Sequence, residues 1–369
     1  MAALRARPQG IQTVYGGLFY GRYGTLTHRA AEEAHAVLEE GHKSCAVSSG
    51  RAAMVCVLMG LLRKGDVVLY SSDITPALKS FLCVEMKRLG VTSVSFQASS
   101  SRDALLSQHG PDLDRARMVL VETFSPSSPA LADVPMLAEL CRQRQSLLVV
   151  DNTWAFGWAL QPLKEGADVS VASLGPLAGD QEWDLGMVTS RRELWPRIVS
   201  SCKRLGLVAS PEQTYQTLRG LRTLPLRMRQ QDQTTRAVVE WMMGVEQVSR
   251  VFHPMLEGGA AEKGFTGFPP ILSFCLSSEN SEEEQVEALV ESLKRFRLGW
   301  DGSVGGELSL VWPVGLVSDW RREQNFRRPD ESGERGRILL YIGLEEAGDL
   351  IEDLRRAFEC LQEIQDGRT

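Results

Sequence analysis

Short apolar runs alternate with helical patterns along the first half of the chain, and this alternation constrains the fold more than any other feature. The expected strands cover residues 45–48, 67–70, 91–96, 118–122, 147–151 and 169–173. The expected helices cover residues 27–41, with Thr27 as the cap, and residues 50–62, 76–89 and 134–144. Apolar strands separated by helices predict a mostly parallel, doubly wound α/β sheet. A ligand site of such a sheet lies at the carboxyl ends of its strands.

The second half of the chain predicts a smaller domain that mixes strands and helices. A helical stretch over 211–245, interrupted by Pro225, leads into it. Its expected strands are 271–276, 308–312 and 338–342, and its expected helices are 282–297 and 347–362. We therefore predict an N-terminal arm (1–26), a large α/β domain (27–240) and a smaller C-terminal α+β domain (241–369).

Composition limits the classes of partner. A net charge of −6 argues against nucleic-acid binding. The sequence contains no apolar run of about 18 residues, the length that a membrane span needs. Seven scattered cysteines without a CxxC pair, and an N-terminus without a signal-peptide core, indicate a cytoplasmic protein with reduced thiols. We expect no nucleic-acid or membrane partner.

Five segments carry side chains suited to a ligand site, although each alone is also compatible with an ordinary turn. They are residues 20–28, 48–53, 122–127, 151–154 and 166–176. Free amides at the helix start beside Gly50 can hold a phosphate. Asp151 ends an apolar strand, where it can pair with a protonated ring nitrogen or cap a turn. Arg22 in the arm can reach a phosphate of its own or a neighbouring subunit, or remain solvated.

In their order and spacing these segments resemble the Cys/Met-metabolism family of fold-type-I pyridoxal-phosphate (PLP) enzymes. This family includes cystathionine γ-synthases, cystathionine β- and γ-lyases and methionine γ-lyase. The resemblance extends from about Tyr20 to Leu361, and the runs 219–224, 303–306 and 342–354 contribute to it. The arm, the run 151–154 and Arg222 are most similar to the bacterial cystathionine β-lyase branch. The implied fold is that of the PLP-dependent transferases.

The resemblance implies a cofactor site that is partly kept. The residues carried over are Gly50, Arg51 and Ser173 for the cofactor phosphate, Tyr20 and Arg22 from a neighbouring subunit, and Asp151 for the pyridine nitrogen. A carboxylate beside the ring nitrogen keeps such a cofactor an electron sink.

The same resemblance implies that the catalytic groups are lost. Pro176 occupies the position of the Schiff-base lysine, and proline has no amine with which to form an imine or move a proton. The other departures are Thr75 for a ring-stacking tyrosine, Pro126 for an asparagine, Gly175 for a hydroxyl residue and Leu339 for a carboxylate-binding arginine. We therefore assign no catalytic residue, and expect PLP to bind without a covalent bond or not at all.

Three functions remain open from the sequence. The first is a degenerate homologue without lyase activity, which acts as a homo-oligomer or together with an active paralogue that borrows Tyr20 and Arg22. The second is an enzyme with rebuilt chemistry that binds PLP or another small phosphate-bearing ligand without a covalent bond. The third, which we consider weakest, is an ordinary C–S lyase or γ-synthase that uses a distant lysine.

Two further groups of titratable residues lack the spacing of a metal site. Asp180, Glu182 and Asp184 follow Pro176 without a neighbouring His or Cys, so a solvated acidic loop is favoured over the acids of a rebuilt pocket. His28, His35 and His42 recur every seven residues near one helix face, which favours surface or interface positions.

Overall fold

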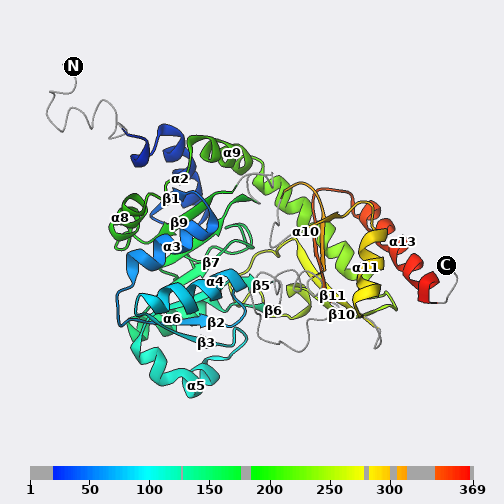
Figure 1. Cartoon of the computed structure of the whole chain (residues 1–369), viewed down its shortest axis with the longest axis horizontal. Coiled ribbons are helices and arrows are strands. Elements are labelled where there is room, and N and C mark those ends of the chain that lie inside the picture. Colours follow the sequence, from blue (N-terminus) through cyan, green and yellow to red (C-terminus); the bar gives the residue numbers. More distant parts are fainter. Residues whose placement is uncertain are drawn as a thin grey trace.

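The computed structural model describes residues 20–125, 128–175, 184–277, 282–299, 306–313 and 337–365. These residues build two sheets with helices around them, and the long helix α10 (Leu224–Met242) passes from the first sheet to the second (Figure 1). The mostly parallel α/β sheet and the smaller second sheet were both predicted and are confirmed. The exact domain boundaries stay a prediction.

The first sheet has seven strands in the order β1-β9-β8-β7-β4-β2-β3. Their bounds are β1 Lys43–Val47, β2 Val67–Ser71, β3 Thr92–Phe96, β4 Ala116–Glu122, β7 Leu147–Asp151, β8 Val169–Ser173 and β9 Gly186–Ser190. All neighbours pair in parallel except β9, which runs antiparallel to both β1 and β8. The parallel strands β4, β7 and β8 therefore end at one edge of the sheet.

Helices cover both faces of this sheet. They are α2 Leu26–Leu38, α3 Gly50–Leu61, α4 Pro76–Phe81 with the π-turn Leu82–Met86, α5 Arg102–Arg115, α6 Val134–Arg144 and α8 Trp195–Leu205. One apolar cluster joins Val121 and Leu148 of the sheet to Leu137 of α6. A second joins Val149 to Val57 of α3 on the opposite face. Burial of these two clusters explains why the sheet strands are almost entirely apolar.

The second sheet has five strands in the order β10-β11-β14-β13-β12. They are β10 Val248–Phe252, β11 Ile271–Leu276, β12 Arg297–Leu298, β13 Leu310–Pro313 and β14 Arg337–Tyr341. The helices α10, α11 (Glu282–Ser292) and α13 (Ala347–Gln365) pack on it through Val239, Val286 and Phe358. The structure also contains a hairpin of β5 (Phe124–Ser125) and β6 (Ser128–Leu131), and two short helical turns, η2 (Gly21–Tyr23) and η4 (Pro254–Leu256).

One predicted helix start was wrong, and one predicted helical stretch is divided into two helices. The first helix is capped by Thr25 and not by Thr27, because the Thr25 hydroxyl accepts the amide of His28 while the His28 ring accepts the amide of Thr25. The stretch 211–245 forms two helices, α9 (Pro211–Leu221) and α10. Pro225 lies in the first turn of α10, where no intrahelical amide bond is required.

The predicted exposure of the histidines was also wrong. His28 and His35 do share a helix face, but this face is buried, with exposed fractions of 2% and 0%. His28 Nε2 lies 2.9 Å from the carbonyl oxygen of Ala209, and His35 Nδ1 lies 3.0 Å from the hydroxyl of Thr189. Polar partners thus allow both rings to be buried. Among the described helices, none combines the length and the apolar character needed to cross a membrane.

Candidate cofactor site

The turn from β1 into α3 packs tightly against the last residue of β8 and the first residue of β9. Ser49 caps α3, its side chain accepting the amide of Ala52 at 3.0 Å. A Cβ at Gly50 would lie 2.5 Å from the Cβ of Ser173, and one at Gly186 would lie 2.1 Å from the carbonyl oxygen of Ser49. Glycine is therefore required at both positions by close approach. The structure thus brings Gly50 and Ser173, two of the predicted phosphate-binding residues, into contact.

Asp151 connects to this turn through one intermediate side chain. Its Oδ1 accepts hydrogen bonds from the amide of Thr153 at 3.1 Å and from the Thr153 hydroxyl at 2.6 Å. The same hydroxyl accepts the amide of Ser173 at 3.0 Å. Burial raises the pKa of Asp151, and the two bonds from Thr153 oppose that shift. Asp151, Ser173 and Gly50 therefore form one continuous edge at the carboxyl ends of β7 and β8.

A second buried carboxyl group lies beside Asp151. It belongs to Glu122, the first residue of the predicted segment 122–127, to which we assigned no role from the sequence. Glu122 ends β4 and is the register partner of Asp151 on β7. Its Oε1 accepts the amide of Thr75 at 2.6 Å. Burial, followed by the charges of Asp151 and Asp73, raises the pKa of Glu122 well above its ordinary value. The arrangement therefore favours a neutral Glu122 beside Asp151. The sequence feature that could have indicated this carboxyl pair is an acidic residue at the end of each of two successive predicted strands.

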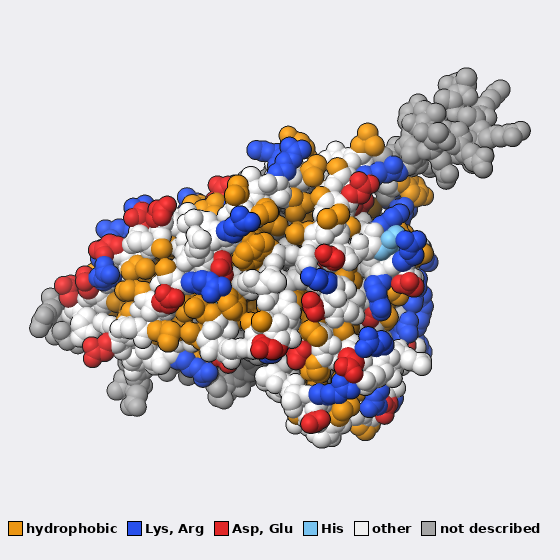
Figure 2. Space-filling view, turned by 180° about the vertical axis from the view of Figure 1, so that it is seen from behind, with side chains coloured by type: hydrophobic (Ala, Val, Ile, Leu, Met, Phe, Trp, Pro, Cys, Tyr) orange, Lys and Arg blue, Asp and Glu red, His pale blue; other side chains and the backbone are white. Residues whose placement is uncertain are grey.

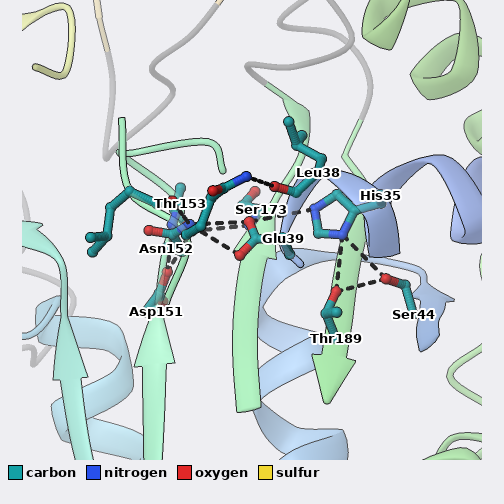
Figure 3. A network of polar contacts seen from close by, with 11 residues as sticks. His35, Leu38, Glu39, Ser44, Asp151, Asn152, Thr153, Ser173 and Thr189 are labelled. Atoms are coloured by element: carbon teal, nitrogen blue, oxygen red, sulfur yellow. Dashed lines mark hydrogen bonds and ion pairs between the residues drawn. The ribbon is translucent and has the colours of Figure 1, made fainter. Parts of the chain in front are cut away.

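The chain directly after Asp151 is held in place by a buried polar network (Figure 3). The next residue, Asn152, donates from Nδ2 to both carboxyl oxygens of Glu39, at 3.0 and 3.2 Å, and to the carbonyl oxygen of Leu160 at 3.0 Å. Glu39 Oε1 lies 4.0 Å from Nε2 of His35. Asn152, Glu39 and His35 have no solvent-exposed surface, so the network fixes the chain directly after β7.

Burial makes both titratable members of this network favour their neutral forms. It raises the pKa of Glu39 to about 7 and lowers that of His35 to about 3. Between pH 4.5 and 6.5 the folded chain therefore holds one proton on Glu39, whereas the unfolded chain holds one on His35. Because the two states bind equal numbers of protons, this pair contributes no pH dependence to the free energy of unfolding in that range.

Substitution of either Glu39 or His35 should expose the pH dependence that the other residue contributes to the free energy of unfolding. In Glu39→Gln the remaining His35 has a lowered pKa, so relative to the native chain the free energy of unfolding should fall as pH drops from 6.5 to 4.5. In His35→Gln the remaining Glu39 has a raised pKa, so stability should fall as pH rises over the same range. Each slope is expected to approach about 1.4 kcal/mol per pH unit. Urea unfolding of the native chain and both variants at four pH values measures this, and parallel profiles would contradict it.

Tyr20 and Arg22, the described arm residues of the predicted site, contact α8 and each other rather than the remaining site residues. Arg22 donates from Nη1 to the carbonyl oxygen of Lys203 on α8 at 3.1 Å. Its guanidinium lies 5.6 Å from the centre of the Tyr20 ring and 5.5 Å from that of Tyr23. These contacts join η2 to α8 rather than to Gly50, Arg51, Ser173 or Asp151. Tyr20 is 58% exposed, which is compatible with the predicted contribution to a neighbouring subunit.

Two of the described lysines contact groups other than the site carboxyls. Pro176, Pro126, Asp180 and Glu182 lie outside the described residues. All eight lysines of the chain are inside them, namely Lys43, Lys64, Lys79, Lys87, Lys164, Lys203, Lys263 and Lys294. Lys203 lies over the Tyr23 ring, and Lys263 donates to the carbonyl oxygen of Leu131.

The position expected to bind a substrate carboxylate is part of an apolar core. Leu339 on β14 is 3% exposed and belongs to the apolar cluster of the first sheet. Arg337, two residues earlier, places its guanidinium 4.0 Å from the centre of the Phe252 ring. Leu339 therefore offers no charge to a carboxylate.

Asp184 is exposed, in agreement with the favoured interpretation of a solvated acidic loop. Burial raises the pKa of its carboxyl group, and the neighbouring Gly50 amide and Arg51 charge oppose that shift. No local pattern signals this proximity, because residues 50 and 184 approach each other only through the pairing of β9 with β1 and β8. In the described ranges, no group of three or more His, Cys, Asp or Glu side chains is arranged to hold a metal ion.

The sheet order, the α3 turn and Asp151 at the end of β7 define an α/β protein of the PLP-dependent type. The family model of the Cys/Met metabolism PLP-dependent enzymes matches residues 5–359, and the chain belongs to this family. It is 30% identical to the cystathionine beta-lyase of Escherichia coli K12 over 351 residues, which are 93% of this chain and 86% of the relative. It is 31% identical to the cystathionine gamma-synthase of Mycobacterium bovis over 358 residues, 94% of this chain and 88% of the relative.

Solved structures agree with this assignment. The cystathionine gamma-synthase of Xanthomonas oryzae pv. oryzae in complex with cystathionine superposes with a TM-score of 0.82 at 27% identity, covering 93% of this chain and 88% of that chain. The cystathionine gamma-lyase of Lactobacillus plantarum has a similar fold, with a TM-score of 0.83 at 24% identity and the same coverage.

Proposed function

We propose that this chain is a member of the family that has lost lysine-dependent C–S lyase and synthase chemistry and acts through association with another subunit. The observation that carries the proposal is chemical. Pro176 stands where the resemblance requires a lysine, while Lys203 and Lys263 contact the Tyr23 ring and the carbonyl oxygen of Leu131. Without an amine at that place, neither the covalent link nor the proton transfer has a carrier.

The residues present fit PLP only in part. The Asp151 carboxylate, oriented by Thr153, suits a protonated ring nitrogen, and the Ser173 amide is fixed through the same hydroxyl. PLP would supply an electron sink if bound, but Pro176 at the position that the resemblance gives to the lysine offers it no covalent anchor. We therefore assign no catalytic step to it.

Exposed apolar side chains support the association. Leu26 on α2 is 75% exposed, Tyr215 on α9 is 51% exposed, and α2 packs on α9. Leu226 near the start of α10 is 67% exposed. Figure 2 shows broad hydrophobic areas, interrupted by charged side chains, on one face of the molecule. The partner is a second copy of this chain or a lysine-bearing paralogue, to which Tyr20 and Arg22 would contribute.

Purification from the native cell tests this proposal. The tagged chain, isolated at natural abundance, is expected to bring along a lysine-bearing homologue or to form an oligomer without lyase turnover. Mass spectrometry of the complex and a cystathionine cleavage assay give the answer. A lone homo-oligomer that turns over substrate would refute it.

The carboxyl pair favours a second candidate, an enzyme with rebuilt chemistry. Glu122 with a raised pKa next to Asp151 is the kind of pair that can divide acid and base roles. The ligand would then be held without a covalent bond. Any activity found should be lost in Asp151→Asn, and its persistence in that variant would exclude this candidate.

A further inference from the structure

Three buried polar atoms near the ends of β7 and β8 have no hydrogen-bond partner among the described residues. They are His35 Nε2, Asn152 Oδ1 and Ser170 Oγ. All three side chains are 0% exposed, so bulk solvent does not reach these atoms. Folded proteins pair nearly all such buried groups with protein atoms or ordered water, because an unpaired one is costly. Three of them in one region therefore point to a ligand that forms hydrogen bonds.

The register of the sheet places the Ser170 side chain on the same face as the His35 ring. Ser170 of β8 is the register partner of Thr189 on β9, and Thr189 Oγ1 lies 3.0 Å from His35 Nδ1. Register partners on neighbouring strands project from one face of a sheet, about 5 Å apart. On its other side β8 pairs with β7, which Asn152 follows directly. Ser170 therefore lies under α2, between His35 and Asn152.

The carboxyl group of Glu39 lies in the same place. Figure 3 shows it between the His35 ring and Asn152. Its two oxygens accept Nδ2 of Asn152 at 3.0 and 3.2 Å, whereas its Oε1 is 4.0 Å from His35 Nε2, too far for a direct hydrogen bond. The three unpaired atoms thus belong to the three side chains around one buried carboxyl group.

We propose that one ordered water molecule binds beside Glu39 and forms hydrogen bonds with His35 Nε2, Asn152 Oδ1 and Ser170 Oγ. Buried waters typically make about three hydrogen bonds to polar groups that are otherwise unpaired. A water molecule both donates and accepts, so it suits the Asn152 oxygen, the Ser170 hydroxyl and either tautomer of the His35 ring. It thereby joins Glu39 to His35 across the gap that the two side chains leave.

The surrounding groups favour water over a metal cation. Glu39, Asn152 and Ser170 offer few oxygens, and both oxygens of Glu39 already accept hydrogen bonds. A cation such as Ca²⁺ takes about six to eight oxygen ligands. The ring nitrogen of His35 replaces an oxygen on one side of the space. A small neutral molecule that donates and accepts hydrogen bonds is the ligand that these atoms fit.

A high-resolution crystal structure of the full native chain tests this inference. We expect one water peak within hydrogen-bond distance of at least two of the three atoms. Crystals grown in rubidium chloride should show no anomalous signal there, because rubidium replaces monovalent cations at their sites. A peak that contacts fewer than two of the atoms, no peak at all or a rubidium signal at this place would overturn the inference.

Ser170→Val and Ser190→Val form a matched pair for a measurement in solution. Both serines are 0% exposed, but Ser190 directly follows Thr189 and so projects from the opposite face of the sheet, where it donates to the carbonyl oxygen of Arg191. Valine at position 170 removes one partner and fills space beside Glu39. Oxygen-17 relaxation dispersion should therefore count one long-lived water molecule fewer in Ser170→Val than in the native chain.

The Ser190→Val variant should keep the native count, because its valine lies away from Glu39. Far-ultraviolet circular dichroism establishes that each variant is folded. An unchanged count in a folded Ser170→Val chain would contradict the inference. If that variant does not fold, the crystal structure of the native chain decides alone.

Discussion

With PLP and L-cystathionine supplied, the purified chain is expected to release thiol at least about 10,000-fold more slowly than a lysine-bearing member of the family. Removal of a group that both bonds the substrate-carrying cofactor and transfers the proton has effects of this order. Lys203 and Lys263 are held away from this role, because Lys203 lies over Tyr23 and Lys263 is bonded to the carbonyl of Leu131. Leu339, buried in an apolar cluster, adds no carboxylate-binding charge.

The cystathionine beta-lyase of Escherichia coli, 30% identical, is the reference enzyme for that assay. Thiol release with a chromogenic disulfide and pyruvate formation should be followed in parallel, so that cleavage at either carbon–sulfur bond is detected. Dialysis against PLP before the assay excludes simple loss of cofactor during purification. Turnover within 100-fold of the reference would contradict the proposal.

The second large effect concerns stability. Gly186→Ala should lower the free energy of unfolding by about 3 kcal/mol, because the new methyl group would lie 2.1 Å from the carbonyl oxygen of Ser49 and 3.0 Å from the Cβ of Ala53. The nearest atoms belong to backbone and cannot rotate away. The chain would have to separate the start of β9 from the cap of α3.

Gly348→Ala is the matched control, because a Cβ added there would meet no atom within 4 Å and the residue lies in the first turn of α13. It should leave stability unchanged or raise it by up to about 1 kcal/mol. Urea unfolding followed by tryptophan fluorescence measures both variants. A Gly186→Ala midpoint equal to that of the native chain would show that α3 and β9 are not held together as described.

Elements with strong local signals could be predicted from the sequence. Val134–Arg144 has a cap at Asp133 and a proline in its first turn, and both ends were predicted as observed. The strand Val169–Ser173 is an apolar run that was also predicted with the observed bounds. By contrast α5 was missed, because Gly110 and Pro111 interrupt its pattern and the structure bends at His109. The strand Gly186–Ser190 was missed because half of it is polar or glycine, although it is fully buried.

The residues of the candidate site likewise divide into those that could be predicted from the sequence and those that could not. Gly50, Ser173 and Asp151 follow or end strands, so the parallel order of those strands was enough to predict that they meet. The close approach of Gly186 to Ser49 depends on β9 running antiparallel, and the network of Glu39 with Asn152 depends on a helix that packs against the sheet end. Such contacts follow from tertiary packing and leave no local pattern in the sequence.

The most direct test of the central claim is borohydride reduction of the chain after incubation with PLP, followed by peptide mapping of all eight lysines. We predict that no lysine is modified stoichiometrically, and that modification is partial, spread over exposed lysines and competed by free amines. A single lysine modified in full would contradict the account, since it would identify the amine that the site is claimed to lack.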